Sequence, residues 1–185
     1  MLPQLIPYSI FYCLQFFIPL LFVVNTARVE LPFLNLKALV VATNITILIA
    51  GLLTIFIPVS QLVIAYFSGA EYEQYIIVNH YIGPMGMFAW LSLLTQTVIP
   101  QMMWNKSFRR SVVSACIWLI AYWTFQLANT LLLKYVVGSS WATFTPDKHL
   151  IDYAGDAIIF LMVIVPVYLL VDLNAKRGYI KRSER

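Results

Sequence analysis

The sequence predicts an all-α integral membrane protein, a bundle of about five transmembrane helices. Of its 185 residues, 61% are hydrophobic and only 11% are charged, which is about half the charged fraction of an ordinary soluble domain. Apolar runs of about twenty residues recur along the whole chain, and a helix needs about that length to cross a bilayer. The chain shows no alternating pattern of barrel strands, so helices are the expected spanning elements.

The expected spans follow one another with short connections. The first has no Lys or Arg ahead of it and no small-residue cleavage site after it, which predicts a helix rather than a signal peptide. The second contains Gly51 and Pro58 and is longer than an upright crossing needs, so it is expected to tilt, kink or extend past the headgroups. One domain, residues 1–173, and a basic cytoplasmic tail, residues 174–185, are predicted. The spans cover approximately residues 5–24, 37–67, 85–104, 111–135 and 150–173.

The basic residues predict the orientation of the bundle. Ten of the twelve Lys and Arg residues fall in alternate connections and in the tail, whereas the other connections hold only Lys134 and Lys148. Cytoplasmic connections of membrane proteins are enriched in Lys and Arg. The C-terminus is therefore predicted to be cytoplasmic and the N-terminus outside. Because this placement explains the net charge of +4, no nucleic-acid partner is expected.

Two aspartates near the start of the last span are candidates for a chemical role. Asp152 and Asp156 are four residues apart, so they lie on one face of a helix near its outer end. An ionisable residue within a span is costly and usually faces a cavity or a partner, which makes the pair a candidate proton relay or quinol contact. In the structural alternative, the helix dipole favours Asp152 in the first turn, and only Asp156 needs an explanation.

Both histidines, His80 and His149, are predicted on the outer side. Haem ligation by the pair is not expected, because haem-binding bundles place histidines on facing helices at matching depth. Each is a candidate hydrogen-bond partner of a quinol or of another subunit, and the simpler alternative is an interfacial residue with no chemical task. Cys13 and Cys116 lie far apart inside apolar runs, which predicts buried thiols. No metal ligands and no catalytic residues are expected, so the chain is not expected to act alone as an enzyme.

Three short segments of the sequence carry a resemblance to a known family. They are "AYFSGAEYEQYIIVNHYIGP", "IPQMMWNKSFRRS" and, ahead of the last span, "SSWATFTP". In this order and at this spacing they resemble the C-terminal half of the NrfD, or polysulfide reductase membrane-subunit, family, in the variety found in alternative complex III.

The resemblance implies a multi-pass subunit of the bacterial inner membrane, within a quinol:cytochrome c (or HiPIP) oxidoreductase. Its implied partners are other membrane subunits of the same complex, periplasmic iron–sulfur and cytochrome c subunits, and lipids. Quinol would be oxidised nearby, and haem c and iron–sulfur clusters would be held by the partner subunits. The residues Glu71, Tyr72, Glu73 and Tyr75 would then form a docking surface for the periplasmic subunits.

The chain departs from the family pattern at points that bear on catalysis. Full-length members have many more spans, and the half usually credited with the quinol pocket lies upstream of anything present in this chain. Places where the family often carries Glu, or a Glu-Arg pair, hold Gln61, and Phe125 with Gln126. Neutral side chains keep hydrogen-bonding capacity but do not accept a proton. A structural subunit with no cofactor or redox centre of its own is therefore expected.

Two alternatives stay open. The chain would contact quinol directly, or help to move protons, if Asp152, Asp156, His80 or His149 lay near the quinol headgroup. It would be a small transporter if Asp156 and Asn129 lined a polar path across the bundle.

Overall fold

The computed structural model describes residues 2–29, 34–69, 71–83, 86–132 and 150–183. Every regular element in these ranges is helical, as predicted. In chain order they are α1 (Leu2–Thr26), α2 (Leu36–Ser68), α3 (Glu71–Ile82), α4 (Gly86–Leu93), the π-helical segment η1 (Leu94–Val98), α5 (Ile99–Gln101), the 3₁₀ turn η2 (Met102–Trp104), α6 (Lys106–Arg109), α7 (Val112–Leu132) and α8 (Leu150–Ser183).

Three of these helices are long and apolar enough to cross a membrane. The qualifying stretches are Ile6–Thr26 in α1, Leu36–Phe67 in α2 and Asp152–Arg177 in α8, and a shorter apolar run, Val112–Ala128, lies in α7. The predicted third span, residues 85–104, is broken by the π and 3₁₀ turns and is not one regular helix. Length and apolar character thus agree with a membrane protein at the three longest helices.

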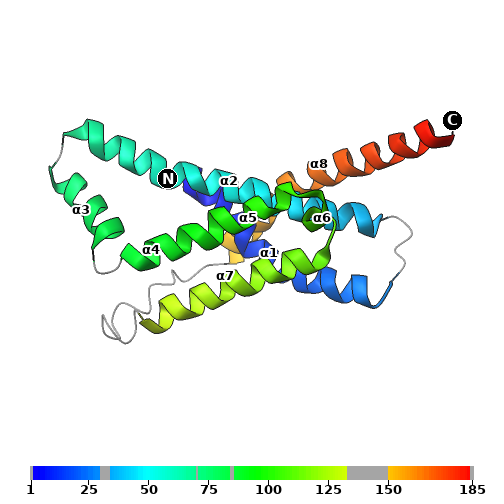
Figure 1. The fold of residues 1–185 in the computed structure, drawn as a ribbon, viewed down its shortest axis with the longest axis horizontal. Helices are drawn as coiled ribbons and strands as arrows, with labels where there is room; N and C mark the ends of the chain where they lie inside the picture. The colour runs from blue at the N-terminus through cyan, green and yellow to red at the C-terminus, as the bar shows by residue number, and fades with distance from the viewer. Residues whose placement is uncertain (1, 30–33, 70, 84–85, 133–149, 184–185) are drawn as a thin grey trace.

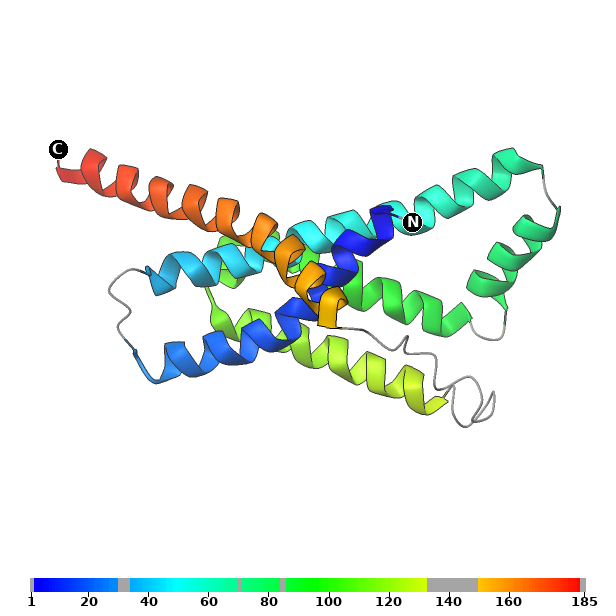
Figure 2. The same cartoon turned by 180° about the vertical axis from the view of Figure 1, so that it is seen from behind.

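α1 packs against the three other long helices. Its buried residues Ile10, Phe11, Leu14 and Ile18 recur at helical spacing, and α1 contacts α2, α7 and α8. Figure 2 shows α1 and α8 crossing at the middle of the molecule. In a bilayer such packing is held by close van der Waals contact and interhelical hydrogen bonds, because lipid is as apolar as the side chains it covers.

The irregular segment between α4 and η2 follows from Pro100. Proline has no N–H to donate to the carbonyl one turn earlier, and its ring crowds that carbonyl. The chain widens to a π-turn, in which the Ile99 N–H donates to the Leu94 carbonyl. Gly51 of α2 receives Pro100, because an added Cβ at Gly51 would lie 2.7 Å from Pro100 Cβ and 3.1 Å from the Gln96 carbonyl oxygen.

Side chains satisfy the carbonyls of this irregular segment. Thr95 Oγ1 donates to the Leu91 carbonyl at 3.1 Å, and Thr97 Oγ1 donates to the Leu93 carbonyl. Gln101 Nε2 donates to the Thr97 carbonyl at 3.0 Å. These bonds matter because a buried, unpaired carbonyl within a membrane costs several kcal/mol.

The two ends of the bundle differ in charge. The start of α2, the whole of α6 and the C-terminal half of α8 lie at one end, and α3 lies at the other with the C-terminal end of α7 (Figure 1). The predicted tail, residues 174–185, is helical as far as Ser183, because α8 continues to that residue and projects past the other helices. The first end carries Lys37, Lys106, Arg109, Arg110, Lys176 and Arg177.

Candidate functional site

A polar cluster lies where α1 crosses α8. Ser9 Oγ donates to Asp156 Oδ1 at 2.6 Å, and Asp156 is only 6% exposed. Beside them the rings of Tyr12 and Tyr153 lie 5.7 Å apart, and the two phenols are hydrogen-bonded. Hydrogen bonds between side chains of different helices stabilise helix packing within a bilayer. Asp156 therefore ties α8 to α1.

Asp152 and Asp156, which were predicted to act as a pair, have different environments. Asp152 lies in the first turn of α8 and is exposed, whereas Asp156 is buried one turn later under α1. A carboxylate in the first turn is stabilised by the helix dipole. The roles predicted for the two carboxylates stay predictions.

The predicted docking residues lie on a helix of their own rather than in a loop. Gly69, at φ 63°, ends α2 in the left-handed conformation, and α3 begins two residues later. Gln74 Nε2 donates to the Ala65 carbonyl at 3.2 Å, which holds α3 against the end of α2. The Glu71, Tyr72 and Tyr75 side chains are exposed.

Three predicted residues are described less fully. Glu73 and His80 belong to α3, but their side chains fall outside the described part of the chain. His149 lies outside the described residues altogether. The predicted use of these residues stays a prediction.

The far end of α3 contacts the bundle through Tyr81. Trp90 Nε1 of α4 donates to the Tyr81 carbonyl at 3.0 Å, and the two rings lie 6.0 Å apart. Burial raises the pKa of the Tyr81 phenol, and the neighbouring Tyr8 of α1 raises it further. Tyr81 is therefore neutral at physiological pH, and it joins the end of α3 to α4.

A stack of aromatic rings sets the position of the Tyr122 hydroxyl. The Tyr122 and Trp118 rings of α7 are stacked at 5.5 Å, and Phe11 of α1 contacts both, at 5.9 Å and 5.4 Å. Trp118 Nε1 donates to the carbonyl of Thr95, in the π-turn, at 3.2 Å. The π-turn thus anchors the stack, and the stack fixes Tyr122.

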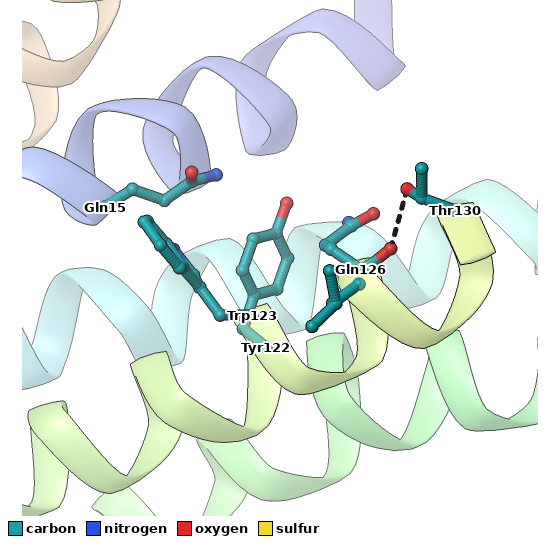
Figure 3. Close-up of a pocket in the computed structure, with 6 residues that line it drawn as sticks. Gln15, Tyr122, Trp123, Gln126 and Thr130 are labelled. Atoms are coloured by element: carbon teal, nitrogen blue, oxygen red, sulfur yellow. Dashed lines mark hydrogen bonds between the residues drawn. The ribbon is translucent and has the colours of Figure 1, made fainter. Parts of the chain in front are cut away.

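A groove of about 290 Å³ opens beside that hydroxyl, between α1 and α7 (Figure 3). The Tyr122 hydroxyl has the side-chain amides of Gln15 and Gln126 within hydrogen-bonding reach. Thr130 Oγ1 is already used, because it donates to the Gln126 carbonyl at 2.8 Å. None of the lining residues carries a charge: Gln15, Tyr122, Trp123, Gln126, Leu127 and Thr130.

At the basic end, Asn35 joins α2 to α8. Its Oδ1 accepts from the Ala38 N–H at 3.3 Å and caps α2. Its Nδ2 donates to Asp172 Oδ1 at 3.2 Å, and its backbone N–H donates to the Tyr168 hydroxyl at 3.0 Å. Asp172 also pairs with Lys176, at 2.8 Å. These bonds hold the start of α2 against α8.

Among the buried polar residues of α2, Asn44 joins its helix to another segment. Asn44 Nδ2 donates to the carbonyls of Arg109 and Ser111, each at 2.9 Å. Thr46 does not, because its hydroxyl donates to the Ala42 carbonyl of its own helix. In the described residues no group of His, Cys, Asp and Glu side chains has the arrangement of a metal site.

Sequence reasoning missed Ser9, Gln15, Tyr122 and Asn35. A signal was present for Gln15, because an amide in the middle of an apolar run needs a partner. None existed for the pairing of Ser9 with Asp156, which are 147 residues apart. Comparisons with known proteins supply no such signal: no family model, no curated protein and no solved structure matches this chain. The family resemblance stays a prediction.

Proposed function

We propose that this chain is a structural membrane subunit of a bacterial quinol:electron-acceptor oxidoreductase of the alternative complex III type, with no redox centre of its own. In this proposal five segments cross the inner membrane, the N-terminus is periplasmic, and the basic end faces the cytoplasm. Partner subunits hold haem c and iron–sulfur clusters. The three phrases that resemble the NrfD family support the type of complex.

The observation that carries the proposal is the exposed surface at the end of the bundle that holds α3. Tyr72 of α3 is 75% exposed, and Tyr66, Phe67 and Tyr75 beside it are exposed as well. Exposed aromatic rings that gather on one surface are typical of contacts with another protein. α3 is held in place by α2 and α4, so it presents this surface in a defined position.

The outer half of α2 gives further support. Among residues 55–67 only Ala65 is buried, and large side chains such as Phe56 and Ile64 are exposed. In Figure 1 this half of α2 and α4 diverge toward α3. Lipid can cover the apolar part of this surface, whereas the polar helix α3 at its tip needs water or a protein partner.

The environment of Asp156 favours a structural subunit over one that contacts quinol directly. Its carboxylate is buried and bonded to Ser9, and a quinol would have to separate α1 from α8 to reach it. Asp152 is exposed and compatible with either role.

Co-purification tests the proposal. The double variant Glu71→Gln, Glu73→Gln removes two charges from α3 without changing side-chain shape, and it is expected to lower the yield of periplasmic cytochrome and iron–sulfur subunits after detergent extraction. Asp152→Asn, which removes an exposed charge from α8, is the matched control and should leave the yield unchanged. The proposal fails if the wild-type chain is isolated from its native membrane with no cytochrome or cluster-bearing subunit.

A further inference from the structure

We infer that α7 and the α1–α7 groove form the interface of a parallel homodimer, in which α7 of a second copy of this chain occupies the groove. This surface lies on other helices than α3 and the outer half of α2, which the proposed function uses. The inference shares with the proposed function only the crossing of the membrane by α7, and it does not depend on which complex the chain belongs to.

The face of α7 that turns away from the bundle carries a seam of apolar residues with one threonine. Its members alternate at spacings of four and three residues, and each is exposed. On the inner face Ala115, Trp118, Tyr122 and Phe125 repeat at the same spacing and are buried. A seam of this spacing packs against a second helix of the same direction. The exposed seam consists of Val113, Ile117, Ile120, Thr124, Leu127 and Leu131.

Lipid can cover the apolar seam, but it does not bond the amides beside it. A glutamine amide has two N–H donors and a carbonyl acceptor. Hydrogen bonding to the Tyr122 oxygen uses one N–H each of Gln15 and Gln126, and the rest of both amides lines the groove (Figure 3). An unbonded donor or acceptor in hydrocarbon is costly. The occupant of the groove must therefore carry polar groups.

The depth of these amides excludes a lipid headgroup as the occupant. Gln15 lies near the middle of the apolar stretch Ile6–Thr26, and Tyr122 lies near the middle of α7. Because the hydrocarbon core is about 30 Å thick, residues in the middle of a crossing helix lie far from both headgroup layers. Side chains of another crossing helix offer donors and acceptors at that depth, whereas lipid tails do not.

The composition of the surface favours a second copy over an unrelated helix. Copies in one membrane have the same orientation, so a twofold axis along the bilayer normal brings identical residues together at the same depth. Gln15 and Gln126 then meet the same amides, which supply both donors and acceptors. No charged residue lines the groove or belongs to the seam, so the two identical surfaces meet without repulsion between like charges.

The shape of the surface is also self-complementary. The groove, of about 290 Å³, is a hollow, and the exposed side chains of Trp123 and Leu127 stand at its mouth (Figure 3). In twofold packing the projecting side chains of one copy enter the hollow of the other, as knobs enter holes between paired helices. A second copy thus fills the groove with side chains that this surface itself provides.

Energy transfer between labelled copies tests the inference. The full chain carries Cys13→Ser, Cys116→Ser and Asn174→Cys, the last at an exposed position of α8, and is labelled with a donor or an acceptor dye. The two preparations are mixed in phosphatidylcholine vesicles over a range of protein-to-lipid ratios. A dimer predicts energy transfer that saturates as the ratio rises.

Substitution of the amides tests which surface forms the dimer. The double variant Gln15→Leu, Gln126→Leu should raise the half-saturating protein-to-lipid ratio at least about threefold, as expected for the loss of one hydrogen bond between membrane helices. Gln61→Leu is the matched control, because it removes an amide from α2 outside the groove; it should dimerise like wild type.

Disulfide formation locates the interface while the amides stay intact, so it does not depend on the folding of the double variant. Leu127→Cys, in the background without other cysteines, places a thiol on the exposed seam beside the groove, and mild oxidation should join two copies. Met162→Cys is the control, because Met162 is exposed in the apolar stretch of α8; it should stay monomeric under the same conditions.

Four outcomes would overturn the inference. Energy transfer that rises linearly with protein density indicates chance encounters only, and unchanged transfer in the double variant shows that the amides do not hold the dimer. Equal cross-linking of Leu127→Cys and Met162→Cys places no interface at the seam. Cross-linking of Leu127→Cys to a different protein in native membranes, with no dimer formed, assigns the groove to a foreign helix. Each leaves the co-purification experiment unaffected, so the two proposals fail separately.

Discussion

At the scale of single residues, the hydrogen bond between Ser9 and the buried Asp156 allows a direct test of whether Asp156 stabilises the packing of α8 on α1. Ser9→Ala removes the donor at 2.6 Å and leaves the carboxylate with less compensation, so we expect a loss of about 1–3 kcal/mol in the free energy of unfolding. SDS titration in mixed micelles, followed by helical circular dichroism, measures it. Ser60→Ala, at an exposed serine whose hydroxyl bonds the Ile57 carbonyl, should change stability by less than about 0.5 kcal/mol. Equal effects of the two substitutions would contradict the tie between α1 and α8.

Asn44 is a second residue whose contribution is predicted from its bonds. It is fully buried, and its amide donates to two carbonyls in the turn between α6 and α7. Asn44→Leu removes both bonds and should cost about 2 kcal/mol. Asn44→Asp should cost more, because a carboxylate cannot donate and would face two carbonyl oxygens.

Thr46→Val provides the control for Asn44 under the same SDS titration. It lies in the same helix and is equally buried, but its hydroxyl bonds only its own helix. We expect a change of less than about 1 kcal/mol. If Asn44→Asp proved as stable as wild type, the amide would not hold the α6–α7 turn.

At the scale of elements, the contact between α2 and the π-turn depends on the absence of a side chain at Gly51. Gly51→Ala places a methyl group 2.7 Å from Pro100 Cβ, so the two segments must separate, at a cost of about 1–3 kcal/mol. Gly155→Ala is the matched control: Gly155 lies within α8 with open space around it, and this substitution should be neutral or stabilising by up to about 1 kcal/mol.

A double variant shows whether the cost of Gly51→Ala comes from crowding against Pro100 or from the changed flexibility of α2 itself. Adding Pro100→Ala to Gly51→Ala removes the ring that the new methyl group meets. The cost of the double variant should therefore be smaller than the sum of the two single costs by at least about 0.5 kcal/mol. Additive costs, measured by the same unfolding titration, would show that Gly51 and Pro100 act independently.

The elements also show how far the sequence alone leads. Apolar length predicts α1, α2 and α8, because lipid imposes that length whatever the neighbours are. It does not predict the π-turn at Leu94–Val98, which depends on Pro100 meeting Gly51 across two helices. For α3 the sequence identifies the polar segment but not its helical form.

The same limit applies to the sites. Asp156 is recognisable as an ionisable residue in an apolar run, whereas its partner Ser9 is a common residue with nothing in its own segment to mark it. The Tyr122 groove is likewise assembled from α1 and α7, and an aromatic residue in a membrane helix ordinarily indicates packing or an interface. A site built from side chains of distant segments is visible only once the fold places them together.

At the scale of the whole molecule, the number of crossings is the property that decides between arrangements. The irregular run Gly86–Trp104 has nineteen residues and α7 has 21. At about 1.5 Å per residue each approaches the 30 Å of a hydrocarbon core. Lys106, Arg109 and Arg110 between them lie at the same end as the basic part of α8. Both observations favour five crossings over the three of α1, α2 and α8.

Cysteine labelling distinguishes five crossings from three. Both arrangements place the C-terminus on the same side of the membrane, but they place α6 on opposite sides. In a background with Cys13→Ser and Cys116→Ser, a membrane-impermeant maleimide is applied to intact spheroplasts that carry Tyr72→Cys, Ser107→Cys or Asn174→Cys. All three positions are exposed. With five crossings, Tyr72→Cys in α3 should react at once, whereas Ser107→Cys in α6 and Asn174→Cys in α8 should react only after permeabilisation. With three crossings α6 stays outside with α3, so rapid labelling of Ser107→Cys in intact spheroplasts would reject the five-crossing arrangement while leaving the orientation of α8 in place.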